Sequence, residues 1–107
     1  MKKKTGAWLT GMAACILITS GAAAAGDPEA GYFKAKTCMG CHASPSRTNV
    51  YPTYKVPMIA GQHPEYIMSA LKAYATGQRI HPTMVANAST LSEQDMADIA
   101  AFFSTAQ

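Results

Sequence analysis

The sequence predicts a small all-α domain in which three main helices are separated by long loops. Two observations support this class. Apolar residues recur at helical spacing in two segments, residues 64–76 and 92–105, and each segment begins with a residue that favours a helix start. Polar stretches with several prolines lie between the helices, and residues 43–61 show no pattern of a long strand.

The first 25 residues have the layout of a secretory signal peptide. Three lysines follow the first methionine, an apolar run covers residues 7–19, and small residues fill positions 21–26. A membrane-spanning helix needs about 20 apolar residues, so a retained anchor is the weaker alternative. Lipidation at Cys15 is a second alternative to cleavage after Ala25, although Met12 is a poor residue three places before a lipidated cysteine. We predict cleavage after Ala25, a mature domain of residues 26–107 and a periplasmic location.

Removal of the signal peptide changes the charge of the chain. The whole chain carries a formal charge of +3, but three of its lysines lie in the signal peptide. The six basic side chains that remain are Lys34, Lys36, Arg47, Lys55, Lys72 and Arg79, and the six acidic ones are Asp27, Glu29, Glu65, Glu93, Asp95 and Asp98. This balance gives no support to nucleic acid or an acidic membrane as a partner. Lys34 and Lys36 near the end of the first helix, and Glu93, Asp95 and Asp98 on the last, are expected to lie on solvated helix faces.

The first two helices have clear starting signals. Asp27 can cap a helix that begins at Pro28, and this helix is expected to run to about Cys38. Pro64 opens the second helix, and Gly77 is placed to end it. The predicted apolar face of the second helix consists of Ile67, Ala70, Leu71 and Tyr74.

The last helix begins at Ser92, which can act as an N-cap ahead of acidic residues in the first turn. Its predicted buried stripe consists of Met96, Ile99, Ala100 and Phe103. Residues 79–89 are predicted to form an irregular loop. Three helices cannot make a large core in the 82 residues left after cleavage, a size at which a domain commonly needs a staple. Long loops in such a domain usually wrap something functional.

The most specific motif is Cys38-Met39-Gly40-Cys41-His42, the C-x-x-C-H pattern of covalent c-type haem attachment. Both thiols can add to vinyl groups on one side of the porphyrin, and the imidazole that follows then lies beneath the iron. Structural zinc normally needs four ligands, and no second paired motif is present. A redox dithiol would need alternating strands and helices, and a plain disulfide would leave His42 without a purpose. The motif predicts one haem c, with Cys38 and Cys41 as attachment residues and His42 as an iron ligand.

Around this motif the chain resembles the class I c-type cytochromes, in particular small bacterial periplasmic cytochromes whose module also occurs in tandem in dihaem proteins. The resemblance covers Ala30-Gly31, the haem motif, VPMIAGQHPEYI from residue 56, HPTM from residue 81 and LSEQDMADIAAFF from residue 91. It implies a small class I cytochrome c fold wrapped around one covalent haem. It also implies that the first and last helices cross near Gly31, approached by Ile99 or Phe103, and that the Pro57 carbonyl accepts a hydrogen bond from His42.

Several side chains are candidates for the sixth iron ligand: Met39, Met58, Met68, Met84, Met96, His63 and His81. Met39 lies between the anchoring cysteines and cannot reach the opposite side of the ring. Two other methionines lie on predicted helices, where packing is expected. The resemblance places the ligand-bearing loop around Met84, which we predict as the ligand, with Met58 and His81 as alternatives. His63 is expected to be a capping or surface residue.

The predicted function is one-electron transfer between redox proteins by a periplasmic monohaem cytochrome that is not an enzyme. Met/His coordination raises the reduction potential and fills the position that oxygen would need. The alternatives are an electron-accepting cytochrome subunit of a dehydrogenase or oxidase complex, and an open-site haem enzyme or gas sensor.

The expected partners are therefore a redox donor and a redox acceptor. The protein is expected to be a monomer or to form transient complexes, and no stable membrane insertion is expected after cleavage. The predicted contact is an apolar rim that consists of Met39, Ala43, Pro45 and Met58. Tyr66 and Arg79 are candidate hydrogen-bond partners of the haem propionates.

Overall fold

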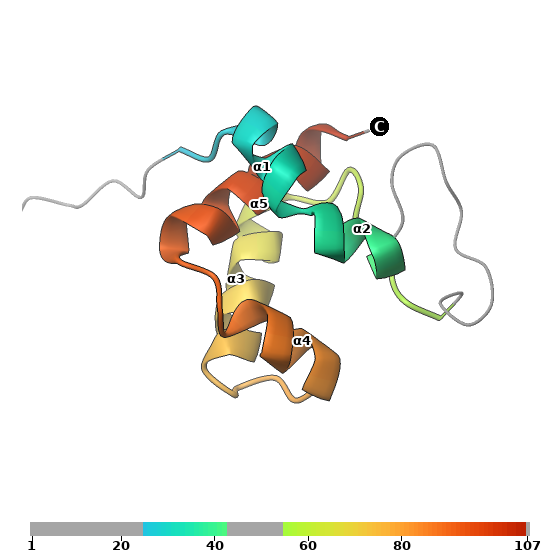
Figure 1. Ribbon diagram of the computed structural model, residues 1–107, viewed down its shortest axis with the longest axis vertical. Helices are drawn as coiled ribbons and strands as arrows, with labels where there is room; N and C mark the ends of the chain where they lie inside the picture. Colours follow the sequence, from blue (N-terminus) through green and yellow to red (C-terminus); the bar gives the residue numbers. More distant parts are fainter. Residues whose placement is uncertain (1–24, 43–54, 107) are drawn as a thin grey trace, which may run out of the picture.

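A computed structural model describes residues 25–42 and 55–106, and these residues form five helices and no strand. The helices are α1 (Pro28–Lys34), α2 (Lys36–His42), α3 (Pro64–Ala75), α4 (Pro82–Ala88) and α5 (Glu93–Thr105). Helix α1 crosses α5, α3 packs against α5, and α4 packs on α3 (Figure 1). The all-α class is confirmed, whereas the number of predicted helices is too low.

Helices α1 and α2 replace the predicted single helix that was expected to end near Cys38. Asp27 caps α1 as predicted, because its side chain accepts hydrogen bonds from the backbone N–H groups of Glu29 at 2.9 Å and Ala30 at 3.4 Å. The helix is interrupted at the buried Ala35, where the backbone has φ −80° and ψ 1°. Helix α2 then continues to His42. The interruption lets α1 pack on α5 while the segment with the haem motif extends past it (Figure 1).

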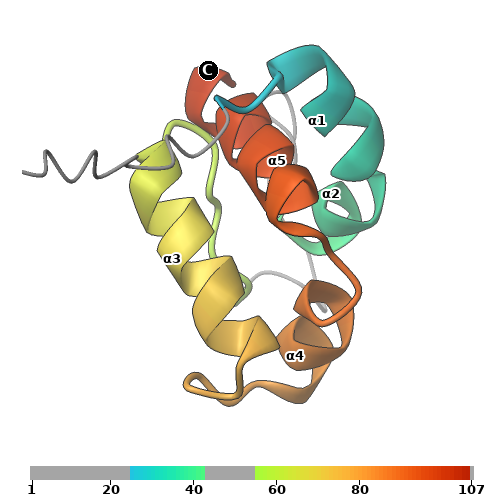
Figure 2. The same cartoon turned by 90° about the vertical axis from the view of Figure 1, so that its left-hand side faces the viewer.

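The predicted crossing of the first and last helices at Gly31 is confirmed (Figure 2). A Cβ atom on Gly31 would overlap the backbone carbonyl of Asp98 and lie 2.8 Å from the Cβ of Phe102. The prediction that Ile99 or Phe103 approaches this glycine is wrong. Both of these side chains are fully buried in the core. They follow Asp98 and Phe102, the two residues that meet α1, by one position each and therefore point in another direction.

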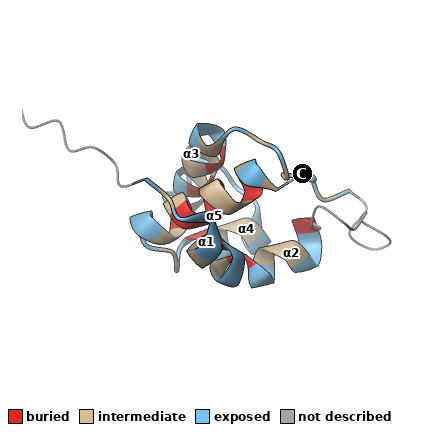
Figure 3. Cartoon of the chain, turned by 90° about the horizontal axis from the view of Figure 1, so that it is seen from above, coloured by how far each residue is buried: buried red, intermediate tan, exposed pale blue. Residues whose placement is uncertain are grey.

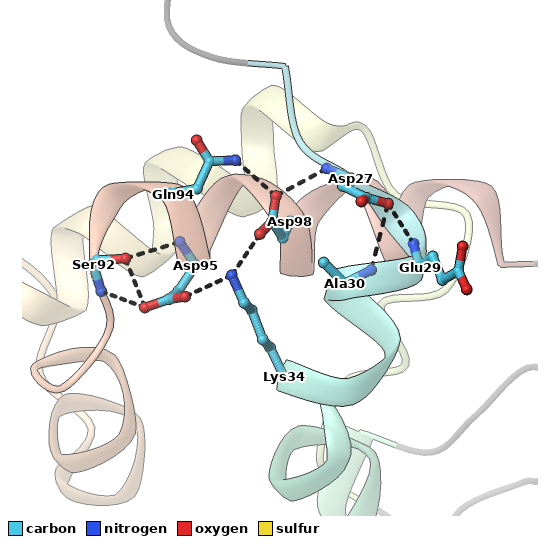
Figure 4. A network of polar contacts seen from close by, with 8 residues as sticks. All are labelled: Asp27, Glu29, Ala30, Lys34, Ser92, Gln94, Asp95 and Asp98. Carbon is cyan, nitrogen blue, oxygen red and sulfur yellow. Dashed lines mark hydrogen bonds and ion pairs between the residues drawn. The ribbon is translucent and has the colours of Figure 1, made fainter.

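Charged side chains also meet at this crossing, which corrects the expectation that they lie on solvated helix faces. Lys34 of α1 forms ion pairs with Asp95 and Asp98 of α5 (Figure 4). The side chain of Asp98 is 4% exposed and also accepts hydrogen bonds from the backbone N–H of Asp27 and from Gln94. The approach of the two helices at Gly31 brings these residues together, and no local pattern in the sequence predicts it.

The core lies mainly between α3 and α5. Its buried apolar residues are Ala35, Ile67, Leu71, Ala88, Met96, Ile99, Ala100 and Phe103, coloured red with the other buried residues in Figure 3. This set contains the whole predicted stripe of the last helix. Two residues of the predicted face of α3, Ala70 and Tyr74, are instead half-buried. Both line a cavity, so their outer sides are not covered by protein.

The ends of α3 and α5 follow the predicted signals. Ser92 and Asp95 form a capping box at the start of α5, each accepting a hydrogen bond from the other's backbone N–H. Gly77 follows the C-cap of α3 with φ 75°, a left-handed conformation that glycine adopts without strain. His63 occupies the N-cap position of α3, but its side chain makes no capping hydrogen bond and it is exposed.

Helix α4 lies inside residues 79–89, which were predicted to be irregular, so that prediction is wrong. Pro82 occupies the first turn of α4, where its missing N–H carries no cost. Met84, Val85 and Ala88 have helical spacing, and only Ala88 is buried. The segment is too short for a strong local signal, and packing on α3 stabilises it as a helix.

Some predictions concern residues outside the described ranges. The predicted signal peptide lies there except for Ala25, and so do Ala43 and Pro45 of the predicted apolar rim. Within residues 25–42 and 55–106, no helix is long and apolar enough to cross a membrane.

Candidate haem site

Helix α2 carries the attachment motif. Cys38 and Cys41 are both free, and their separation of three residues places them as neighbours on one side of the helix. Cys38 is half-buried and Cys41 is exposed. Burial raises the pKa of the Cys38 thiol, because the thiolate would lose solvation there. The two thiols can therefore bind one group that lies along this side of α2.

His42 ends α2 and is buried. Its Nδ1 lies 2.7 Å from the carbonyl oxygen of Pro57, so the contact implied by the resemblance is confirmed. A carbonyl oxygen only accepts hydrogen bonds, so Nδ1 must carry the proton and donate. In the neutral imidazole the other ring nitrogen, Nε2, then has a lone pair, as a metal ligand requires.

A cavity of about 550 Å³ lies beside His42, between α3, α4 and the segment that leads into α3. Its volume falls in the range of cofactor sites, roughly 300–1,000 Å³. Apolar side chains of three segments form much of its wall: Val56, Pro57, Met58, Ile59, Ile67, Ala70, Leu71 and Met84. Cys41 also lines it, so an attachment thiol and a candidate ligand share the same space.

The cavity brings together three of the candidates for the sixth ligand, Met58, His81 and Met84. Met84 is half-buried on α4, which replaces the predicted ligand-bearing loop. Met58 is 56% exposed. Met84 is therefore more covered by protein than Met58 and His81, which are both exposed.

The remaining candidates lie elsewhere. Met96 is buried in the core, and Met39 and Met68 pack against it, as expected for methionines on helices. His63 is exposed and does not line the cavity.

Polar side chains lie together on one part of the cavity wall. The Arg79 guanidinium contacts the Tyr66 hydroxyl at 3.5 Å and lies 4.8 Å from the centre of the Tyr74 ring. The hydrogen bond to Tyr66 is the largest cause of a raised pKa for Arg79. The sequence indicated Tyr66 and Arg79 but assigned Tyr74 to the core. The helical spacing of Tyr74 predicted the correct face of α3, but it did not indicate that a cavity lies on that face.

These residues fit a haem. The wall is mainly apolar, two thiols and an imidazole lie at one side, a thioether is available, and a guanidinium can face an anionic group. By contrast, no three His, Cys, Asp or Glu side chains of the described residues are grouped around a possible metal position.

Comparison with known proteins agrees with this chemistry. Residues 30–107 match the family model described as cytochrome c, so the chain belongs to the cytochrome c family. The all-α fold and the haem motif make it a class I c-type cytochrome, as the resemblance implied, and its cofactor is covalently bound haem c. Proteins of this family are electron carriers.

Its relatives include one that is matched over nearly its whole length and others that are longer. The chain is 40% identical over 84 residues to cytochrome c-554(548) of Halomonas halodenitrificans, covering 76% of this chain and 98% of the relative. It is 38% identical to cytochrome c4 of Thiocapsa roseopersicina and 36% identical to cytochrome c4 of Pseudomonas aeruginosa, over 75% and 84% of this chain. It spans only 40% and 45% of those two proteins.

Proposed function

We propose that this protein is a periplasmic monohaem cytochrome that carries single electrons between redox proteins and does not transform a substrate. Met84 and His42 line one mainly apolar cavity beside the attachment thiols, and this arrangement carries the proposal. The bound haem supplies the one-electron couple between ferric and ferrous iron.

The side chains would have distinct tasks in this function. Cys38 and Cys41 would hold the ring through thioethers, and His42 would bind the iron through Nε2. The Pro57 carbonyl fixes the orientation and protonation of that imidazole. Met84, which lines the same cavity from α4, would supply a second iron ligand.

The two axial ligands together favour electron transfer over catalysis. Binding of the iron by both His42 and Met84 would leave oxygen and peroxide no place to bind. The apolar wall keeps water away from the ring, and no described side chain needs to move a proton during the reaction.

Export and partner binding complete the proposal. The signal peptide of residues 1–25 would direct the chain to the periplasm, where it acts as a monomer that meets donor and acceptor in transient complexes. An electron-accepting cytochrome subunit of a dehydrogenase or oxidase complex is the alternative function.

The test combines spectroscopy, mass and fractionation on the native protein. We expect covalent haem on a chain that begins at Gly26, found in the periplasmic fraction, with a reversible one-electron transition and no carbon monoxide binding by the ferrous form. Binding of carbon monoxide by the native ferrous protein would instead support the open-site haem enzyme or gas sensor. Co-purification with a dehydrogenase or oxidase in fixed stoichiometry would support the subunit.

A further inference from the structure

His81 lies in the wall of the cavity that contains Met84, and the proposed function gives it no task. It is the N-cap residue of α4, three positions before Met84, and its backbone is extended, with φ −151° and ψ 111°. N-cap side chains commonly bond to the start of their helix, but the imidazole of His81 makes no capping hydrogen bond. The His81 imidazole therefore does not stabilise the start of α4 by a capping hydrogen bond.

The chemistry of the cavity wall favours His81 as a metal ligand. Apart from His42 and the attachment thiol, the lining side chains that can bind iron are those of Lys55, Met58, Tyr66, Tyr74, His81 and Met84. Lysine and tyrosine side chains must first lose a proton, which in water happens well above neutral pH. Imidazole suits iron, whereas a thioether is a soft and weaker donor for the ferric state. The best competitor of Met84 in this wall is thus His81.

The structure of α4 allows either His81 or Met84 to act as an iron ligand. The helix has seven residues, one of which is buried, and it packs on α3 and on no other described helix. The residues that lead into it, 76–81, are all exposed, and Ile80 is 89% exposed. Helices with so little burial belong to the least stable parts of a protein. A small shift of α4 can therefore exchange one candidate ligand for the other.

We infer that His81 is a reserve ligand of the iron, which coordinates when the Met84 thioether is not bound. This inference rests on the proposed function, because it requires a haem held by Cys38, Cys41 and His42. Two imidazoles give a lower reduction potential than a thioether with an imidazole. Exchange at α4 would therefore change the protein from a higher-potential carrier into a lower-potential form with no open position.

The test uses the haem-loaded protein at mildly alkaline pH and at low concentration, so that histidines of other molecules do not bind. The variants are Met84→Ala, Met84→Ala/His81→Ala and the matched control Met84→Ala/His63→Ala, since His63 is exposed and does not line the cavity. Electron paramagnetic resonance and near-infrared magnetic circular dichroism of the ferric state report the axial ligands. Met84→Ala and the control should show low-spin iron with two imidazoles, and the His81 double variant should become high-spin.

Added imidazole gives an independent measure. It must displace His81 in Met84→Ala and in the control, so it should bind at least tenfold more tightly to Met84→Ala/His81→Ala. The single variant His81→Ala should keep the thioether signal, which shows that the substitution leaves the fold intact.

The outcomes separate this inference from the proposed function. High-spin iron in Met84→Ala would overturn the role of His81 and leave Met84 as the normal ligand. A thioether signal that persists in Met84→Ala would overturn both assignments. A two-imidazole signal that is lost with His63 and kept without His81 would overturn the inference as well.

Discussion

The Nζ of Lys34 lies 2.5 Å from the Oδ2 of Asp98, so a lysine of α1 is ion-paired with a nearly buried carboxylate of α5. Asp98 also accepts hydrogen bonds from the Asp27 backbone N–H at 2.9 Å and from Gln94 at 2.8 Å. The Asp27 N–H is the largest cause of a lowered pKa for Asp98, followed by Lys34. The carboxylate of Asp98 thus connects α5 to both ends of α1 (Figure 4).

This arrangement predicts that Asp98 makes the protein sensitive to acid. A carboxyl group whose pKa is lowered by folding contributes stability above its unfolded pKa of about 3.9, and the contribution is lost as the pH falls toward the folded pKa. Asp98→Asn should lower the free energy of unfolding at pH 7 by about 1–3 kcal/mol, because partners of the carboxylate lose charge-assisted hydrogen bonds. The difference from the native protein should shrink below about pH 4.

Thermal unfolding of the haem-loaded proteins from pH 7 to pH 2 measures this effect. Glu65→Gln, at an exposed carboxylate of α3, is the control and should follow the native curve. An Asp98→Asn curve parallel to the native one at all pH values would contradict the prediction.

Gly31→Ala should destabilise the protein by about 2–4 kcal/mol. Alanine favours helices, but its Cβ would overlap the Asp98 carbonyl, which belongs to the backbone and cannot rotate away. Gly77→Ala is the control: the new Cβ meets nothing within 4 Å, and only the φ of 75° opposes it, at about 1 kcal/mol. Denaturant unfolding of both variants measures the difference. A smaller loss for Gly31→Ala than for Gly77→Ala would show that the two helices can move apart freely.

Met84→Ala should abolish the far-red thioether-to-iron charge-transfer band of the ferric protein and lower its reduction potential. The fall should be on the order of 0.1 V, within the ~0.8 V that axial ligands span. Met58→Ala, at an exposed methionine of the same cavity, should keep both properties. Loss of the band in Met58→Ala and its survival in Met84→Ala would reverse the assignment. Absorption spectra and redox titration provide the measurements.

Covalent attachment should depend on Cys38 and Cys41 alone. Acid-acetone should leave the haem on the native chain and extract all of it from Cys38→Ala/Cys41→Ala. Cys15→Ala is the control and should retain its haem, because Cys15 belongs to the predicted signal peptide. The chain without haem should be largely unfolded, since the cavity wall would lose its main apolar contact. A cooperative thermal transition of that chain would contradict this.

Docking to redox partners should depend weakly on salt. Residues 26–107, the predicted mature chain, have balanced charges, and strong steering needs a concentrated field of one sign. We expect the electron-transfer rate with a physiological partner to change by less than about tenfold between low and high ionic strength, whereas strong steering would give about a hundredfold fall. Met58→Lys, which adds a charge at the exposed rim, should make the rate more sensitive to salt. An unchanged salt response would place the contact elsewhere.

The sequence predicted those features of the fold that short segments determine. Asp27 and Ser92 cap their helices through neighbours two or three residues away, and Gly77 needs only its own backbone freedom. The stripe of α5 follows from spacing alone. The attachment motif is equally local, because two thiols and an imidazole within five residues are sufficient to indicate the cofactor.

The features that the sequence did not predict depend on distant contacts. Helix α4 has one buried residue and is stabilised by packing on α3, and the interruption at Ala35 depends on how α1 meets α5. Lys34 and Asp98 are 64 positions apart, so helix-dipole arguments about each one alone could not indicate their contact. Tyr74 was assigned to the right face of α3, but the cavity on that face is formed by other segments.

The short backbone segment from Pro57 to Gly61 is fastened at both ends. Its first carbonyl accepts the hydrogen bond from the His42 imidazole, and the N–H of Gly61 donates to the carbonyl of Phe103 in α5 at 2.8 Å. The position of the His42 imidazole, the proposed iron ligand, is thus coupled to the terminal turns of α5, whose Phe103 is the largest fully buried residue of the described ranges. Substitutions that loosen the packing of α5 should therefore alter the redox thermodynamics of the iron as well as the melting temperature. In this small protein, we therefore expect the same series of contacts to affect both the stability of the core and the reduction potential of the haem.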